Sequence, residues 1–193
     1  MALRESLALP AAALPAALVA AASLAGCAPA QLHRFQQALR ARDSATAALT
    51  DWCRVEGIAP AGEIRALVDR GAFEAPDAQT RAALGLAPGQ PFGFRHVRLA
   101  CNGVVLSEAK NWYIPAALTP EMNRTLETSD APFGNVVAPL GFHRERLSEH
   151  AGGWPGCPKD TVLSHRGLLR RADGTAISLV IECYTKANFR KKG

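Results

Sequence analysis

The sequence predicts one domain of the α+β class, with helices in its first half and β-hairpins in its second half. Leu32, Phe35 and Leu39 recur at the spacing of one helical face. Asn102-Gly103 and Asp173-Gly174 each separate two strand-like apolar runs, and such pairs are typical of hairpin turns because they tolerate a positive φ. A chain of 193 residues has room for one such domain and not comfortably for two.

The composition fits a packed globular domain. Hydrophobic residues make up 48% of the chain and charged residues 20%, which argues against a disordered chain. The net charge of +5 comes partly from Arg190, Lys191 and Lys192, and no basic block is interleaved with aromatic residues. We therefore expect no nucleic-acid partner. Neither a histidine-rich tract nor a Cys-x-x-Cys spacing occurs, so we expect no metal site.

Residues 1–27 are expected to form a signal peptide that ends in a lipobox, which leaves residues 28–193 as the domain. Pro10 and Pro15 interrupt a long Ala/Leu/Val run, a pattern unsuited to a permanent membrane span but acceptable in a signal peptide. Leu24-Ala25-Gly26-Cys27 resembles the lipobox of bacterial lipoproteins, in which Cys27 would be lipidated and become the first mature residue. This implies an exported protein, periplasmic or held at the outer membrane (Ala28, not Asp, follows the cysteine), whose only membrane contact is the lipid. The alternative is an Ala-rich helix packed on a cytoplasmic domain.

Residues 31–56 are expected to form two helices, because Asp43-Ser44 interrupts the helical spacing and offers an N-cap to the second helix. Trp52 and Cys53 lie on the apolar side of that second helix. Beyond it, frequent Gly and Pro residues divide the chain into shorter elements. The elements expected there are, in order, short helices around 63–68 and 78–84, a hairpin over 94–115, a helix over 119–126, a loop over 142–160, and a hairpin from Val162 to Tyr184.

One charged residue falls on the core-facing side of the first hairpin. Side chains alternate between the two faces of a strand, so Arg95 points the same way as Val97 and Leu99. A buried arginine needs an anionic partner, because an unpaired charge is costly to remove from water. Counting from a two-residue turn places Glu108 on the same face, and a structural ion pair of Arg95 with Glu108 or Glu182 is one interpretation.

Glu182 lies within the run Ser-Leu-Val-Ile-Glu-Cys-Tyr of a strand that we expect to be covered on both faces. Unless it is paired, a carboxyl group in that position would have a raised pKa, which suits a proton donor. Counting from the second turn places His165 opposite Glu182 as a candidate partner. The alternative is that Glu182 is solvated at a frayed strand end.

With Cys27 lipidated, four cysteines remain, and in an exported chain they can form disulfides. Cys53 lies on the apolar side of its helix, and Cys101 ends the core-facing stripe of its strand. Both therefore face one interior, and we expect a Cys53–Cys101 disulfide if the chain is exported. Buried thiols are the alternative.

Residues 43–189 resemble the chorismate pyruvate-lyase family and, more distantly, ligand-sensing domains of some bacterial transcription regulators. Each motif is short, and only their combination and order are specific. The motifs are Asp43-Ser44-Ala45-Thr46 at a helix start, Arg95 eight residues before Gly103 in a hairpin that ends at Tyr113-Ile114-Pro115, Ala131-Pro132-Phe133-Gly134 as the family's Thr-Pro-Leu-Gly loop, and Glu182 in the last strand.

The resemblance implies the chorismate lyase-like fold, which is an antiparallel sheet with helices packed on one side and a ligand cavity closed by loops. It also implies that no cofactor or metal is needed. Arg95 would grip the ring carboxylate of the ligand, and Glu182 would hydrogen-bond the ring hydroxyl and supply a proton. The backbone amides of Ala45 and Phe133 would contact the carboxylate.

Two functions follow from this resemblance. An enzyme would eliminate pyruvate from chorismate to give 4-hydroxybenzoate, with Arg95 as anchor and Glu182 as acid. A non-catalytic periplasmic module would use the same cavity to bind a small aromatic carboxylate. The export signal favours the binding module, whereas the retained Arg95 and Glu182 favour the enzyme. The oligomeric state stays open.

Overall fold

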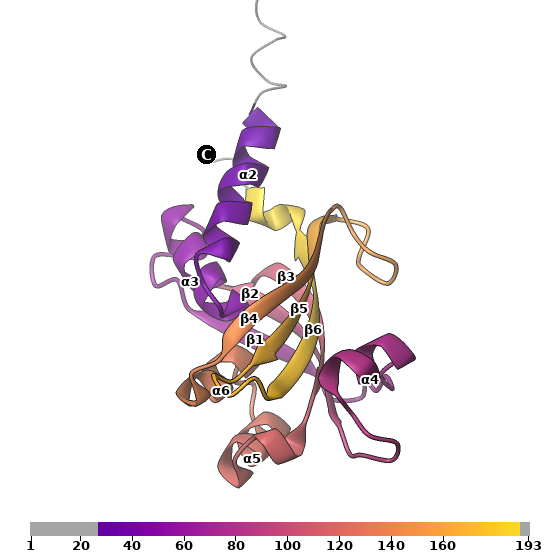
Figure 1. The fold of residues 1–193 in the computed structure, drawn as a ribbon. Helices are drawn as coiled ribbons and strands as arrows, with labels where there is room; N and C mark the ends of the chain where they lie inside the picture. Colours follow the sequence, from indigo (N-terminus) through magenta and orange to yellow (C-terminus); the bar gives the residue numbers. More distant parts are fainter. Residues whose placement is uncertain (1–26, 190–193) are drawn as a thin grey trace, which may run out of the picture.

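Six antiparallel strands form one sheet in the spatial order β1-β2-β3-β6-β5-β4 in the structure, a computed structural model (Figure 1). The structure describes residues 27–189, so the predicted signal segment up to Gly26 and the tail 190–193 lie outside the described residues. The strands are β1 (Ile64–Asp69), β2 (Gly93–Cys101), β3 (Val104–Tyr113), β4 (His143–Ala151), β5 (Thr161–Arg170) and β6 (Ala176–Thr185). The two predicted hairpins are β2–β3 and β5–β6, and they pair through β3 and β6. The predicted α+β class with an antiparallel sheet is confirmed.

Short helices connect and cover the strands. They are α2 (Cys27–Arg40), α3 (Ala45–Val55), α4 (Ala78–Leu84), α5 (Pro120–Thr128) and α6 (Phe133–Val137), with single turns η1 (Pro115–Ala117), η2 (Ala138–Leu140) and η3 (Lys186–Phe189). The N-cap predicted for the second helix is confirmed, since Ser44 Oγ accepts a hydrogen bond from the Ala47 amide at 3.3 Å. Within residues 27–189, no helix combines the length and apolar character needed to cross a bilayer.

The face of the sheet that carries Glu182 and Val180 is called the cavity face. Tyr184 lies on the same face of β6, and its ring packs at 5.3 Å between centroids against Phe35 of α2. Phe35 in turn contacts Trp52 of α3 at 4.9 Å, and all three side chains are buried. This aromatic cluster fixes α2 and α3 over one end of the cavity face, beside the candidate site.

The opposite face of the sheet is covered less completely. Leu179 alternates with Val180 along β6, and it packs with Trp112 of β3 and with Leu84 of the short helix α4. Cys183, on the same opposite face, is joined by a disulfide to Cys157 in the loop between β4 and β5. The helices around the site therefore sit on the cavity face, while α4 and one loop shield part of the other face.

Two segments differ from their sequence-based prediction. Residues 63–68 were expected to form a helix, but Ile64–Asp69 is strand β1, in which buried Ile64 and Ala66 alternate with exposed Arg65 and Leu67. This alternation has the period of a strand, and a six-residue segment is too short for helical spacing to be decisive. Residues 142–160 were expected to form a loop, but His143–Ala151 is the edge strand β4. Its charged residues concealed the strand, because an edge strand exposes most of its side chains.

A β-bulge in the first hairpin changes which residues share a face. Cys101 pairs with Val104 as a two-residue turn requires, but Leu99 pairs with Ser107 because the register shifts by one residue between Leu99 and Ala100. The shift places Glu108 opposite Arg98 and on the face opposite to Arg95. The interpretation that Arg95 and Glu108 form an ion pair is therefore wrong.

Candidate functional site

A cavity of about 50 Å³ lies between the cavity face of the sheet, the first turn of α3 and the helix α6. Its apolar walls come from the strands and from Phe133 and Phe142. Gly134 of α6 allows the two helix starts to approach each other, because a Cβ atom there would lie 2.5 Å from Ser44 Oγ. The sequence thus closes the cavity by placing the small residue Gly134 of α6 against the capping residue Ser44 of α3.

Glu182 lies at this cavity as part of a buried ion pair with Arg144 of β4. Two hydrogen bonds of 2.7 Å join the guanidinium to the two carboxylate oxygens, and both side chains are about 5% exposed or less. Tyr184 donates a third hydrogen bond from its hydroxyl to Glu182 Oε2 at 2.8 Å. This fork-to-fork geometry is the strongest form of the arginine–carboxylate contact.

The pairing decides the protonation state of Glu182. Burial alone would raise the pKa of this carboxyl, but the charge and hydrogen bonds of Arg144 outweigh burial and hold the pKa below its usual value. Burial likewise would lower the pKa of Arg144, and Glu182 instead raises it above its ordinary value. The expectation of a proton donor depended on an unpaired carboxyl, and in this structure Glu182 is an ionised acceptor.

Arg95 is buried but contacts a loop and not Glu182. Its Nη1 donates to the Ala131 carbonyl oxygen at 3.1 Å and its Nη2 to that of Ser129 at 3.4 Å. Arg95 pairs with Asn111, which pairs with Val180, so two strand spacings, about 10 Å, separate it laterally from Glu182. Within residues 27–189 it forms no ion pair, its Nε has no partner, and burial lowers its pKa. The interpretation of an Arg95–Glu182 ion pair is therefore wrong as well.

Of the four residues that the resemblance assigned to the ligand, three line the cavity. Ala45, Phe133 and Glu182 come together there, whereas Arg95 holds the loop that leads into Phe133. Sequence reasoning missed Arg144, because it falls in the segment expected to be a loop. The alternating charges of His143–Ala151 are the signal that could have identified this strand.

Two buried polar side chains that sequence reasoning also missed line the cavity, Asn111 on β3 and Ser178 on β6. They are 4% and 0% exposed, and neither Asn111 Oδ1 nor Ser178 Oγ has a hydrogen-bond partner among the described residues. Buried polar atoms in folded proteins are nearly always paired. The cavity therefore presents two unpartnered hydrogen-bonding groups beside the Arg144–Glu182 ion pair.

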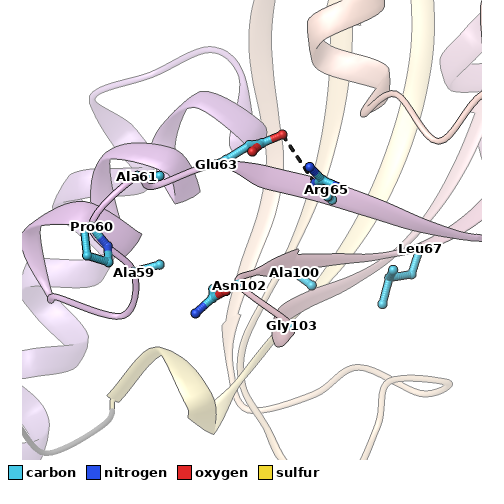
Figure 2. A pocket seen from close by; sticks show the side chains of 9 residues that line it. All are labelled: Ala59, Pro60, Ala61, Glu63, Arg65, Leu67, Ala100, Asn102 and Gly103. Atoms are coloured by element: carbon cyan, nitrogen blue, oxygen red, sulfur yellow. Dashed lines mark ion pairs between the residues drawn. The ribbon is translucent and has the colours of Figure 1, made fainter.

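Larger hollows on the surface lack these features. One of about 480 Å³ runs along β1 between the loop at Pro60 and the turn at Asn102 (Figure 2). It is lined by an exposed ion pair of Glu63 with Arg65 at 3.4 Å, and no buried unpartnered polar atom of the described residues lies in it. Nor does any group of three or more His, Cys, Asp or Glu side chains within residues 27–189 have the arrangement of a metal site.

His165 lies opposite Glu182, and the predicted register is confirmed. Its ring is 3% exposed, packs edge-on against Tyr184 at 5.2 Å, and brings Nε2 to 3.0 Å from Glu149 Oε2 without hydrogen-bond alignment. Burial is the main cause that lowers the pKa of His165, with Arg144 acting in the same direction. Glu182 and Glu149 oppose the shift without cancelling it.

This environment predicts a pH-dependent stability. Above the ordinary histidine pKa of 6.5, His165 is neutral in both the folded and the unfolded chain. Below it, the unfolded chain takes up a proton that the folded chain resists, so the free energy of unfolding should fall as the pH drops from about 7.5 to about 5.5. His165→Gln should flatten that dependence in urea titrations, and His33→Gln, at an exposed position on α2, is the control substitution. A wild-type stability that rises over this range would contradict the assignment.

Two disulfides join cysteines within residues 27–189. Cys53 and Cys101 are bonded in the core between α3 and β2, and both are fully buried. Cys157 is half-buried and is bonded to Cys183, the residue after Glu182. The first pairing is the one expected from the sequence for an exported chain, and the second ties the loop before β5 to the back of the strand that carries Glu182.

No model of a known protein family matches the sequence. A curated relative, described as "Uncharacterized protein y4mC" from Sinorhizobium fredii (strain NBRC 101917 / NGR234), is 38% identical over 161 residues, which cover 74% of this chain and 68% of the relative. Among solved structures, the effector domain of PhnF from Mycobacterium smegmatis has a TM-score of 0.53 at 16% identity, over 74% of this chain and 88% of that domain. PhnF from the same organism gives 0.52 at 16% identity, over 75% of this chain and 64% of that chain. At this identity, the likeness to the solved structures shows a shared fold.

Proposed function

The chain belongs to the family of the uncharacterized protein y4mC, and we propose that it is a non-catalytic module that binds a small aromatic carboxylate in the cavity beside Glu182. The observation that carries the proposal is the pair of buried, unpartnered atoms Asn111 Oδ1 and Ser178 Oγ on the cavity floor. A ligand that hydrogen-bonds to both would remove the cost of leaving them unpaired. The PhnF domain of similar fold is called an effector domain, which supports a ligand-binding role.

The walls of the cavity favour a planar apolar body. Val97 and Val180 line the cavity from the sheet, and Phe133 of α6 and Phe142, just before β4, also line it. Aromatic side chains prefer offset or edge-to-face contact with another ring, so an aromatic ligand would gain both burial and ring contact here. A few polar groups among apolar walls are the usual composition of a small-molecule site.

Three features favour a negative charge on that ligand. The first turn of α3, which begins at Ala45, presents the positive end of a helix dipole at the cavity wall. Arg144 also lines the cavity; Glu182 compensates its charge, but its buried Nε has no partner among the described residues and can donate a hydrogen bond to an anion. The unpaired charge of Arg95 lies on β2, two residues before the cavity-lining Val97, at the loop that leads into Phe133. A carboxylate placed in this field would be favoured over a neutral group.

The cavity must widen to accept such a ligand. Its volume of about 50 Å³ is far below the roughly 300–1,000 Å³ of ordinary small-molecule pockets. The wall that can move is the loop Ser129–Phe133, which Arg95 holds by two carbonyl contacts and Arg70 holds at Asp130 by an ion pair of 2.7 Å. These contacts are to a loop and not to a regular strand, so ligand entry need not disrupt the sheet.

The elimination of pyruvate from chorismate is not supported by the site. That reaction, as the family resemblance describes it, needs Glu182 to supply a proton, and both oxygens of Glu182 are occupied by Arg144. A carboxylate held ionised in this way is a poor acid at neutral pH.

The proposed binding module works outside the cytoplasm, with Cys27 as its lipid anchor. Leu24-Ala25-Gly26-Cys27 supports the anchor. Two disulfides within residues 27–189 support export, because structural disulfides persist in oxidising compartments.

Binding of 4-hydroxybenzoate should raise the unfolding midpoint of the protein. At a ligand concentration about a hundred times the dissociation constant, the stabilisation is about 2.7 kcal/mol, or roughly 5–10 °C for a chain of this size. Ser178→Ala should leave the stability of the free protein within about 1 kcal/mol, because the hydroxyl has no partner to lose, and should weaken binding about three- to tenfold. Calorimetric titration and thermal unfolding measure both effects.

Ser107→Ala provides the matched control. Ser107 Oγ is equally buried and unpartnered on the neighbouring strand β3, but it does not line the cavity, so its removal should not change binding. Pyruvate release from chorismate is assayed on the same samples. Pyruvate release from chorismate would replace the binding module by the enzyme. The proposal fails if neither 4-hydroxybenzoate nor a related aromatic acid shifts the unfolding midpoint and chorismate gives no pyruvate.

A further inference from the structure

Strand β1 is an edge of the sheet, and its outer side is open. It pairs with β2 alone, so alternate backbone N–H and C=O groups point away from the sheet. Leu67, in the middle of β1, is 42% exposed and is one of the few large exposed apolar side chains in residues 27–189. It borders the hollow along β1 that Figure 2 shows, together with Arg65.

The charges on β1 are complementary to those of a second, antiparallel copy of the same strand. When two copies pair around a two-fold axis normal to the sheet, directly opposed residues lie on the same face. If Leu67 lies on the axis, then Arg65 of each copy faces Asp69 of the other. The Arg65 and Asp69 side chains are 76% and 60% exposed, so both are available for this contact.

We propose that two copies of this chain dimerise by antiparallel pairing of their β1 edges, with Leu67 against Leu67 and two Arg65–Asp69 ion pairs across the interface. If the axis lies on Ala66, Glu63 of one copy faces Asp69 of the other, and the two carboxylates repel each other. If it lies on Arg65 or on Asp69, that residue faces its own copy, so like charges are directly opposed. Centring it on Val68 makes no Arg65–Asp69 pair. The Leu67-centred register therefore combines two attractive pairs with no repulsive one.

Such a dimer joins the two sheets into one and keeps both cavity faces on the same side. It is independent of the proposed ligand, since no residue of β1 lines the cavity. Pairing six residues buries less surface than a standard protein interface, so the dimer should be weak, with a dissociation constant in the micromolar range. It should be present at ~100 µM and dissociate on dilution.

The test measures the mass of the full chain by sedimentation equilibrium over a concentration series. Wild-type protein should approach twice the mass of one chain. In a dimer of the Arg65→Asp variant, position 65 of each copy would place an aspartate opposite Asp69 of the other, so like charges meet twice. In a dimer of the Asp69→Arg variant, two arginines meet in the same way. Each variant should therefore raise the dissociation constant at least about tenfold. An equimolar mixture of the two variants restores opposite charges at both positions, and it should form the heterodimer by native mass spectrometry.

Two further variants make the result decisive. Arg124→Asp alters an exposed ion pair with Glu121 on α5 and should leave the mass unchanged. Leu67→Lys keeps the outward-facing strand position and should also give a monomer. A wild-type monomer throughout, an association that survives both charge changes, or two monomeric variants that do not combine on mixing would each overturn the proposal. The charges of β1 would then serve to keep the edge unpaired.

Discussion

Replacing Arg144 with methionine should lower the free energy of unfolding by about 3–5 kcal/mol, because Glu182 then remains buried without a cation. In the wild type, both carboxylate oxygens of Glu182 are bonded to Arg144, and both side chains are removed from water. Methionine replaces the aliphatic stem of arginine and fills much of its volume, so most of the loss reports the uncompensated charge. Urea denaturation at pH 7 measures it.

The pH dependence gives this prediction a second signature. In wild-type protein the pKa of Glu182 is lowered, so this group stabilises the fold above its ordinary pKa of 4.5 and the contribution is lost as the pH falls below that value. In Arg144→Met the remaining burial raises the pKa of Glu182, and the folded state then binds the proton more tightly than the unfolded state. Stability of the variant should therefore increase on mild acidification.

Two controls separate the ion pair from general damage. Arg42→Met removes the partner of Asp51 on the surface of α3 and should cost about 1 kcal/mol or less, because both side chains are exposed. The double variant Arg144→Met, Glu182→Met should recover most of the stability, since a buried pair replaced by apolar groups is often close to neutral. A single Arg144→Met variant as stable as wild type would show that Glu182 reaches water or another cation.

Removing the Cys53–Cys101 disulfide should destabilise the oxidised protein by about 4 kcal/mol. The two cysteines are 48 residues apart, and in the chain-entropy model a loop of this length restricts the unfolded chain by that amount. Replacing both residues by alanine avoids a free thiol and leaves only a small void in the core beside α3. The free energy of unfolding under non-reducing conditions measures the change.

The second disulfide is a control that differs in loop length and exposure. Cys157 and Cys183 are 26 residues apart, so their removal should cost about 3.5 kcal/mol in the same model. Mild reductant should open this bond first, because Cys157 is half-buried whereas Cys53 and Cys101 are inaccessible. Peptide mapping of protein from its native host also tests the proposed export. Free thiols at all four cysteines in that protein would contradict both the stabilisation by disulfides and the location of the protein in an oxidising compartment.

The elements that the sequence predicted correctly are those whose signals lie within a few residues. The turns at Asn102-Gly103 and Asp173-Gly174 locate both hairpins, and Ser44 locates the start of α3. Turn geometry and helix capping depend on residues that are neighbours in the chain, so both can be recognised in a single sequence. His165 lies opposite Glu182 as counted from a two-residue turn, but only because a register shift between Leu169 and Arg170 offsets a turn that is one residue longer than assumed.

The same counting failed where the chain is irregular. One extra residue at the bulge beside Leu99 moves Glu108 to the other face, and no turn or cap signal marks that insertion. Strand β1 was mistaken for a helix, because six residues contain less than two helical turns and propensity cannot separate the two periods. Local sequence patterns therefore predicted that most of the helices and strands exist, but they did not determine which face of the sheet every side chain lies on.

The sequence alone predicted the burial of Glu182 and of Arg95, since each lies within an apolar strand pattern, and both are buried. The partners of both were decided by the tertiary structure. Arg144 reaches Glu182 from 38 residues away, across β5, only because the sheet has the order β6-β5-β4 and its side chain spans the intervening glycine, Gly167. The free energy of a buried charge depends on which groups surround it in space, and strand order, which sets those neighbours, arises from contacts far apart in the chain.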